Sequence, residues 1–589
     1  MSSIDDAGPH AWTIIAQDPS VLWNGRILRT RAVVPDERLL PGPRGHRVHV
    51  VDYDASARVQ YKSGDEPRED AFAGAGDARL LSDPAFHRRN VYAIVMRTLA
   101  TFERALGRRV DWGSGGHQLY VVPHAFCDAN AFYSRADHAL MFGYFPALPK
   151  RGGKKDELVF TCLSHDVVVH ETTHALLDGL RERFMDPSHN DQAAFHEGFA
   201  DVVALLSVFS TREVVGKVLD IAVQKAGKAA GVRRGEPMLP TAILGPKELA
   251  RNGLFGLAEQ MGQELPELRG DALRRSVTLR PSNRLYTSEQ YEEPHVRGEL
   301  LVAAVMQAFV ACWAMRIAKL GEVSKGMVNR ERAVEDGADL ADALLTMAIR
   351  ALDYCPPCDL SYPDYLSALL TADRELRRDD GRWGLRERLT KSFAAFGIDP
   401  VPGSDAAGCW QAPKHPERLV YRRTHFESLR RDPQEVFRFV WENLDELHVD
   451  PSAYTQVISV RPCMRVEPDG FVLHETVAEV HQTIELEARE LSERGIDVPP
   501  GMAPEQRVVL FGGGTFVFDE YGRLKYEIHK RVDDQKRQSA RLAYLWRQAP
   551  SDHDPSRPIG VGGDGQRLHR LHRMRATRWA GAPRKEDVL

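Results

Sequence analysis

Cysteine is scarce in this sequence of 589 residues, and the few cysteines that occur are scattered. Seven is an odd number, and their wide spacing is typical of reduced thiols rather than of a disulfide framework. The positions are Cys127, Cys162, Cys312, Cys355, Cys358, Cys409 and Cys463. We therefore expect the fold to be held together without structural disulfides.

A long uncharged apolar run is also missing, since no stretch of 18 such residues occurs. The most apolar segment, 298–320, is interrupted by Glu299, Gln307, Arg316 and Lys319. We expect it to form the central helix of a helical lobe rather than to contact a membrane. The first residues, MSSIDDAGPHAW, have neither the basic start nor the apolar core of a signal peptide, which favours a cytoplasmic location.

No excess of one charge is present: 78 Lys and Arg face 83 Asp and Glu, for a formal net charge of -5. We therefore expect no nucleic-acid partner. A hydrophobic fraction of 43% with 27% charged residues is typical of globular proteins, and the length predicts two to four domains. The glycines at 512–514 are not followed by the Gly-Lys-Ser/Thr of a phosphate loop, so they predict a bent strand.

What the sequence does contain is an H-E-T-T-H motif at 170–174, inside the largely apolar stretch 158–180. Residues four apart share one face of a helix, so His170 and His174 can offer two imidazoles to one cation. Glu171, one step round the helix, reaches the open side of that cation. The pattern predicts one buried helix that carries half of a metal site.

The same helix is expected to end at Asp178-Gly179, where the glycine can form a left-handed cap. A second helix is predicted at 193–210, with Glu197 placed 23 residues after His174 and Asp201 one turn later. Burying two carboxylates on an apolar helix costs on the order of several kcal/mol unless they are paired or bind metal. A metal ligand at Glu197, with Asp201 accepting a hydrogen bond from a liganding imidazole, explains both.

With 22 histidines in the chain a lone motif could arise by chance, but the second helix makes the pattern specific. The chain resembles the thermolysin-like zinc metallopeptidases (gluzincins), in which H-E-x-x-H is followed one helix later by E-x-x-x-D. The resemblance covers roughly residues 85–400. It implies a Zn²⁺ cofactor bound by His170, His174 and Glu197, a water on the remaining position, and Glu171 as the general base of peptide hydrolysis.

Two further stretches resemble the same family. The sequence N-A-F-Y at 130–133 is similar to the stretch that leads into the family's substrate-binding edge strand, which implies that Asn130 and Ala131 hold an extended substrate. His295 lies where the family places a histidine ahead of a long helix, which implies a catalytic donor to the oxyanion. A loop histidine that only caps this helix, held by Glu292 or Glu293, is the alternative.

The sequence departs from the family pattern in two respects. No tyrosine lies between His174 and Glu197, so His189 or Tyr286 would have to supply the family's second transition-state donor. Asp178, one turn after His174, is a weaker match. The acidic clusters that bind calcium in the family are not recognisable, so calcium is not predicted.

Two other functions remain open at this stage. A non-catalytic binding or scaffold protein could hold zinc for structure, although such sites are usually closed and rich in cysteine. A zinc hydrolase of non-peptide amides or esters would use the same ligands and base. We expect a protein or peptide substrate, while specificity, endo- or exopeptidase action, restraint of activity and oligomeric state stay open.

The predicted fold class is α+β, with a two-lobed thermolysin-like core of an α/β N-lobe and a helical C-lobe, followed by a mixed α/β region. The predicted segments are a β-rich start at 1–85, an α+β lobe with the zinc helices at 86–210, a helical lobe at 211–400, a C-terminal α/β domain at 401–548 and a flexible tail at 549–589. Within the tail, 569–579 is expected to be a solvated segment or a docking peptide.

Periodicity predicts the remaining elements. Helices are expected at 86–106, 338–352, 362–377 and 425–447, and strands at 46–53, 57–62, 118–122, 140–144, 457–466, 471–473, 508–519 and 523–532. The segment 478–494 fits either a helix or a strand. The C-x-x-C at 355–358 lacks a second cysteine pair for zinc, which favours a turn between helices over a metal or redox site.

Overall fold

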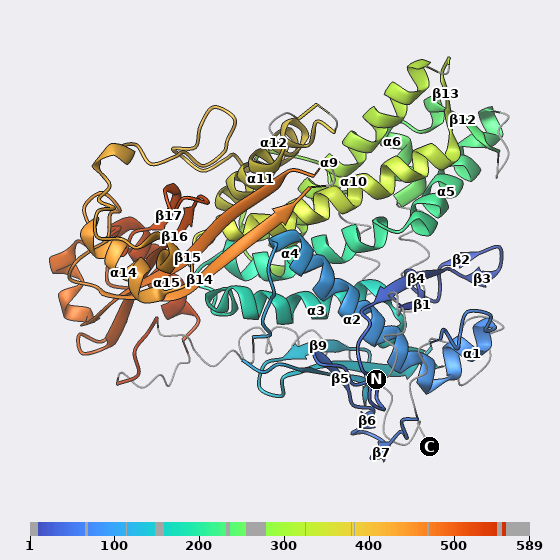
Figure 1. The fold of residues 1–589 in the computed structure, drawn as a ribbon, viewed down its shortest axis with the longest axis horizontal. Coiled ribbons are helices and arrows are strands. Elements are labelled where there is room, and N and C mark those ends of the chain that lie inside the picture. The colour runs from blue at the N-terminus through green and yellow to red at the C-terminus, as the bar shows by residue number, and fades with distance from the viewer. Residues whose placement is uncertain are drawn as a thin grey trace, which may run out of the picture.

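The computed structural model describes residues 10–64, 69–113, 115–147, 158–230, 236–254, 278–323, 325–377, 380–381, 383–467, 470–549 and 556–560. The chain has a mixed α+β structure, as expected. Figure 1 shows the N-terminal strands on one side, a bundle of helices through the middle, and a C-terminal sheet on the other side. The expected tail segment 569–579 lies outside the described residues.

The N-terminal part consists of short strands followed by two helices. The elements are β1 (His10–Ile15), β2 (Leu22–Trp23), β3 (Arg26–Ile27), β4 (Arg29–Val34), β5 (Val48–Val50), β6 (Tyr53–Asp54), β7 (Val59–Gln60), α1 (Asp77–Ser82) and α2 (Pro84–Leu106). The strands expected at 46–53 and 57–62 are therefore present but shorter. The helix expected at 86–106 is confirmed as α2, where the Asp83 carboxylate accepts a hydrogen bond from Ala85 N and caps the first turn.

A five-stranded sheet lies before the predicted metal helix. Its strands are β5, β8 (Leu119–Cys127), β9 (Ala131–Ser134), β10 (Ala139–Pro146) and β11 (Leu158–Phe160), and the short 3-10 helix η1 (Thr161–Leu163) follows them. The order is β11-β10-β8-β5, and β9 pairs with β10. β8 runs parallel to β5 and β10, whereas β9 and β11 are antiparallel to β10.

Helices dominate the described residues between 165 and 395. The elements are α3 (His165–Leu180), η2 (Glu182–Met185), α4 (Asn190–Phe209), α5 (Arg212–Ala230), β12 (Met238–Pro240), η3 (Thr241–Ile243), α6 (Pro246–Glu248), η4 (Leu249–Leu254), η5 (Glu289–Tyr291), α9 (Pro294–Val323), β13 (Met327–Asn329), α10 (Arg330–Arg350), η6 (Ala351–Tyr354), α11 (Tyr362–Leu376) and α12 (Leu385–Ala395). The expected central helix is α9, which packs against α4 and α12.

By length and composition alone, α9 is the one helix among the described residues that could cross a membrane. However, 78% of its most apolar window is buried inside the protein. This burial is what the core helix of a folded lobe requires.

The C-terminal part is built on a four-stranded antiparallel sheet in the order β14-β15-β16-β17. Its elements are η7 (Pro416–Arg418), α13 (Phe426–Leu429), α14 (Pro433–Glu442), β14 (Tyr454–Val466), β15 (Val472–Glu487), η8 (Ala488–Glu490), η9 (Ser492–Arg494), β16 (Arg507–Phe518), β17 (Leu524–Lys530) and α15 (Gln535–Arg547). The open choice at 478–494 is thus settled as strand up to Glu487. The glycines at 512–514 lie within β16, which confirms the expected strand.

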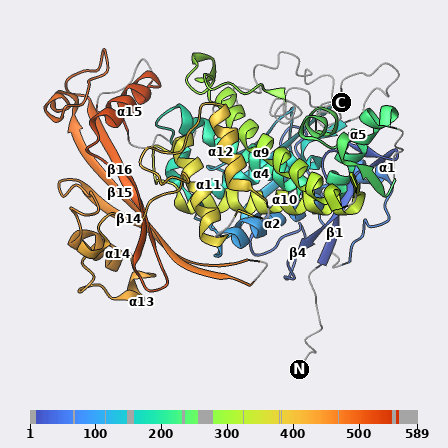
Figure 2. The same cartoon turned by 90° about the horizontal axis from the view of Figure 1, so that it is seen from above.

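Long strands of this sheet reach across to the helices (Figure 2). The backbone N–H of Met464 donates to the Gly107 carbonyl, just after α2. Arg181, at the end of α3, donates to Glu479 Oε2 of β15 at 2.8 Å, and both side chains are buried. The C-terminal sheet is therefore tied directly to the helix that carries the H-E-T-T-H motif, while the domain limits proposed above stay predictions.

Two local predictions were wrong. The segment 425–447 is not one helix: Asp432 caps a new helix through Gln434 N, and Pro433 occupies its first turn, so α13 and α14 are separate. Gly179 is not a left-handed cap, because α3 continues through it to Leu180. The glycine is instead needed for space, since a Cβ there would lie 1.9 Å from the Asp111 carbonyl oxygen.

Candidate metal centre

The helix α3 brings the first two predicted ligands together. It is buried along nearly its whole length, so its two histidines lie inside the protein with about 1% of their surfaces exposed. His170 and His174 stand one turn apart, and their Nε2 atoms lie 2.9 Å from each other. The i, i+4 spacing in the sequence therefore produces the predicted pair of converging imidazoles.

Glu197 enters this pair from α4, which packs against α3. Its carboxylate oxygens lie 3.6 Å from His170 Nε2 and 3.7 Å from His174 Nε2. Zinc bonds of about 2.0–2.1 Å would separate tetrahedral ligand atoms by about 3.3 Å. The three side chains form a group that could hold one metal ion, and their spacing needs adjustments of only a few tenths of an ångström.

The far nitrogens of both imidazoles are also engaged. His170 Nδ1 lies 2.8 Å from Asp201 Oδ1, one turn beyond Glu197 on α4, as predicted. Because a carboxylate can only accept, this contact places the proton of a neutral His170 on Nδ1 and leaves the Nε2 lone pair facing the site. The donor set and its orientation therefore fit a zinc ion.

His196 is a neighbour of the site that the sequence reasoning missed. Its Nδ1 lies 2.6 Å from Nδ1 of His174, and the two rings stack with centroids 4.7 Å apart. If His174 Nδ1 carries the proton and His196 Nδ1 accepts it, His196 orients His174 as Asp201 orients His170 and leaves Nε2 of His174 free of a proton. The only sequence signal was its position directly before Glu197, which by itself indicates no role.

Glu171 is completely buried beside the two histidines. Its Oε2 accepts a hydrogen bond of 3.1 Å from the backbone N–H of Tyr133 in β9. The Tyr133 hydroxyl in turn donates to Asp178 Oδ2 at 2.8 Å, and burial together with Asp178 raises the pKa of Tyr133 so that it stays a donor. Two hydrogen bonds from Tyr133 therefore connect β9 to α3, and one of them is accepted by the predicted base, Glu171.

Asn130 and Ala131 open this same strand. The Asn130 side-chain oxygen accepts from Ala131 N at 2.9 Å, and its carbonyl accepts from Gly143 N at 2.8 Å. Both residues are 8% exposed. The structure places them two to three residues from the Tyr133 contact with Glu171, which is compatible with the predicted substrate-binding edge but does not test it.

His295 lies in the first turn of α9. Its Nδ1 is 2.7 Å from Oε1 of Glu293, one of the two glutamates named in the capping alternative. Burial alone would raise the pKa of Glu293, but hydrogen bonds from His295 and from Val296 N outweigh it and lower the pKa to about 2. His295 Nε2 is buried and has no hydrogen-bond partner among the described residues.

Two close approaches hold the start of α9 against α4. A Cβ on Gly198 would lie 2.9 Å from the Gly298 carbonyl oxygen, so the helices touch through glycines next to Glu197 and close to His295. In addition, Arg297 forms a buried ion pair with Asp191 in the first turn of α4. These contacts hold the first turn of α9, which contains His295, against α4, which contains Glu197.

The two residues considered as substitutes for the missing tyrosine have other contacts. The hydroxyl of Tyr286 donates to Asp191 Oδ2 at 2.5 Å, and burial raises its pKa. His189 Nδ1 accepts from Asp191 N at 3.2 Å and caps α4. Both residues therefore contact Asp191, in the first turn of α4.

The C-x-x-C at 355–358 forms the connection between η6 and α11, as expected. Both thiols are free and buried, and burial raises the pKa of Cys355 and of Cys358. A redox-active pair requires the opposite shift.

No protein-family model, no curated protein and no solved structure matches this chain. The likeness to thermolysin-like peptidases therefore rests on the motifs and on the geometry described above.

Proposed function

We propose that this protein is a zinc-dependent peptidase with the thermolysin-like ligand set, His170, His174 and Glu197. The observation that carries the proposal is the convergence of these three buried side chains from two packed helices, with the buried carboxylate of Glu171 beside them. A two-lobed thermolysin-like core, with the five-stranded sheet in one lobe and α9 in the other, is part of the same proposal.

Zinc held there would act as a Lewis acid and lower the pKa of a bound water towards neutrality. The two imidazoles would bind the ion through Nε2, and Asp201 and His196 would keep both rings oriented. The Glu197 carboxylate would supply the third bond and offset part of the charge of the ion. With three protein ligands, the fourth coordination position of the ion would be open to water or substrate.

Glu171 would take a proton from the attacking water and deliver it to the leaving nitrogen. Its Oε2 accepts a hydrogen bond from Tyr133 N, which fixes the orientation of the carboxylate. A general base has to be within hydrogen-bonding reach of the water, and its place one residue after His170 on α3 puts the carboxylate on the side of the ligand cluster.

His295 would stabilise the oxyanion. The ionised Glu293 accepts from Nδ1–H, so His295 would donate through Nε2 in its imidazolium form, in which both ring nitrogens carry a proton. An extended substrate would bind along β9, near Asn130 and Ala131. Residues 131–134 of this strand pair with β10, and the Tyr133 backbone N–H contacts Glu171 on α3, so a substrate bound there would lie close to the predicted base.

The ligand chemistry favours catalysis over a purely structural zinc. Structural sites usually have four protein ligands and are rich in cysteine, whereas this group has three ligands and no cysteine. A structural site also has no use for a buried carboxylate at position 171. A zinc hydrolase of non-peptide amides or esters would use the same residues and is the second candidate.

Mapping of new protein termini in a cell extract would test the proposal. Wild type and Glu171→Gln would be compared, with Glu331→Gln as a control that changes an exposed glutamate on α10. We expect termini produced by wild type and by Glu331→Gln but not by Glu171→Gln. Absence of new termini with the zinc-loaded wild type, together with turnover of amide or ester probes, would select the second candidate.

A further inference from the structure

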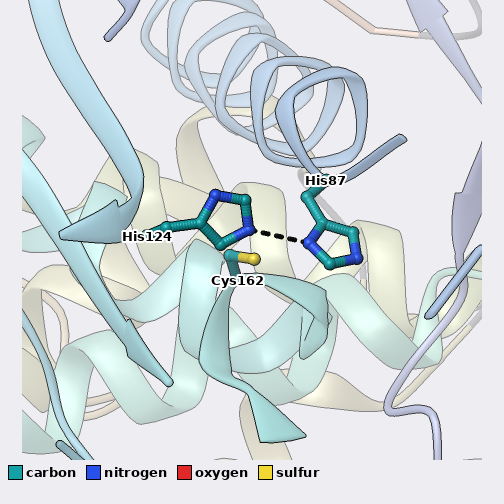
Figure 3. A group of neighbouring side chains, drawn as sticks. All are labelled: His87, His124 and Cys162. Carbon is teal, nitrogen blue, oxygen red and sulfur yellow. Dashed lines mark hydrogen bonds between the residues drawn. The ribbon is translucent and has the colours of Figure 1, made fainter. Parts of the chain in front are cut away.

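A second group of potential metal ligands comes from three elements that precede α3 in the chain. His87 comes from α2, His124 from β8 and Cys162 from η1 (Figure 3). Their ligand atoms all lie within 4.8 Å of one another. All three side chains are 2% exposed or less, so the cluster is closed to solvent.

The hydrogen bonds around the two imidazoles determine which ring nitrogens carry protons. His124 Nδ1 lies 2.7 Å from Asp52 Oδ1, and His87 Nε2 lies 3.0 Å from the Leu81 carbonyl oxygen. Both partners can only accept, so both outer nitrogens must carry a proton. The inner nitrogens, His87 Nδ1 and His124 Nε2, are 2.8 Å apart and face each other (Figure 3).

Two neutral imidazoles carry only two protons, and the outer contacts use both. The inner contact would then bring two lone pairs together. A third proton would create an imidazolium in a dry interior, where Asp52 is already paired with Arg88 at 3.0 Å. A metal ion accepts both lone pairs at once, and it also accepts the thiolate of Cys162.

The surroundings match those of a metal site. Asp52 behind His124 and the Leu81 carbonyl behind His87 are the carboxylate and the backbone acceptor that usually orient metal-binding imidazoles. The ring of Phe160 covers both histidines, with centroids 4.6 and 5.3 Å away. Zinc bonds would separate the donor atoms by about 3.3–3.6 Å, so the inner nitrogens need to move apart by about half an ångström.

We propose that His87, His124 and Cys162 form a second, buried site with three protein ligands for a thiolate-binding transition metal ion, either zinc or copper. Two histidines and one cysteine suit both ions. Such an ion would join α2, the five-stranded sheet and the segment directly before α3. It would thereby fix the start of the helix that carries His170 and His174. The proposal does not depend on the peptidase function.

A Cys-His-Asp nucleophile made of Cys162, His124 and Asp52 is the competing explanation of the cluster. The reactive sulfur would need contact with a substrate, yet Cys162 has no exposed surface.

Elemental analysis of the purified protein tests the site. We expect two metal ions per chain in wild type and one in His170→Ala/His174→Ala, with zinc and copper measured separately to identify the ion. Cys162→Ala should lose one ion, while Cys312→Ala, which removes another fully buried thiol, should lose none. One ion in wild type that disappears in the double histidine variant would overturn the proposal.

Cobalt substitution provides a readout that does not require Cys162→Ala to fold. Of the two ligand groups among the described residues, the second alone contains a cysteine, so a thiolate-to-cobalt charge-transfer absorption reports on that group. We expect this absorption in cobalt-loaded wild type and in His170→Ala/His174→Ala. Its absence from both proteins would contradict the site. If the absorption is present but the protein shows no peptidase activity, the second metal site is supported and only the proposed peptidase function is contradicted.

Discussion

The backbone N–H of Tyr133 donates a hydrogen bond to Oε2 of Glu171 across 38 residues of chain. This contact links a strand of the five-stranded sheet to the carboxylate next to the first histidine of the motif. It holds one oxygen of the buried glutamate and places the outer side of β9 against α3. The predicted base and the predicted substrate strand thus position each other.

The two carboxylates of α4 should affect metal binding to different extents. Glu197→Ala removes a ligand, and we expect the zinc content of that site to be lost. Asp201→Asn keeps the size and shape of the side chain but weakens the hydrogen bond that orients the His170 ring, so zinc affinity should fall about 10–100-fold. Competition with a chromophoric chelator measures both, with His295→Ala as a control of unchanged affinity. Undiminished zinc binding by Glu197→Ala would remove Glu197 from the ligand set.

His295→Ala should lower kcat with little change in KM, because an oxyanion donor acts mainly in the transition state. Losing such a donor typically costs about 2.7–4 kcal/mol, on the order of a 10²–10³-fold drop in rate. Steady-state kinetics and melting curves on the same samples would decide the role. If His295 only caps α9 through Glu293, the variant would melt earlier but keep kcat within a few-fold of wild type.

Cys355 and Cys358 should have no redox role. Burial raises the pKa of both thiols, so neither provides an exposed thiolate. The double variant Cys355→Ser/Cys358→Ser is expected to keep wild-type activity in both reducing and oxidising buffer. Activity that responds to oxidation in wild type, and no longer in the double variant, would show the opposite.

Acid should weaken the attachment of the C-terminal sheet to α3. Burial would raise the pKa of Glu479, but Arg181 and His481 outweigh it and lower the pKa to about 2, below the ordinary value of 4.5. The stabilisation is therefore fully present above about pH 4.5 and is lost as the pH falls through about 2. It amounts to on the order of 3 kcal/mol.

The matched variant for this effect is Glu479→Gln, which leaves Arg181 buried without its ionic partner. We expect it to unfold at lower urea concentration than wild type at pH 7, with the difference shrinking as the pH approaches 2. A difference that does not change with pH would mean that the charge of Glu479 contributes nothing.

The ligand group could be predicted from the sequence because it depends on residue spacing within each of two helices. His170 and His174 share a helical face, and Asp201 follows Glu197 by one turn, so each half needs only the 3.6-residue period. His196 and the Tyr133 contact were missed because they depend on how α3, α4 and β9 pack. His87, His124 and Cys162 have no common spacing at all, since three separate elements bring them together.

Errors in the fold prediction have equally specific causes. The split between α13 and α14 was visible in Asp432-Pro433, a helix start that the apolar periodicity of 425–447 obscured. Gly179 was predicted to be a left-handed helix cap, whereas the structure needs a glycine there because the Asp111 backbone approaches α3 closely. That approach is a tertiary contact, which no local pattern encodes.

Paired zinc content and peptide hydrolysis of Glu171→Gln test the central claim most directly. Glutamine has the same shape, and its carbonyl oxygen can still accept from Tyr133 N, so the fold and the ligands should persist. We expect the zinc content of wild type together with a loss of kcat on the order of 10²–10⁴-fold. Hydrolysis at the wild-type rate by the zinc-loaded variant would contradict the role of Glu171 and, with it, the proposed mechanism.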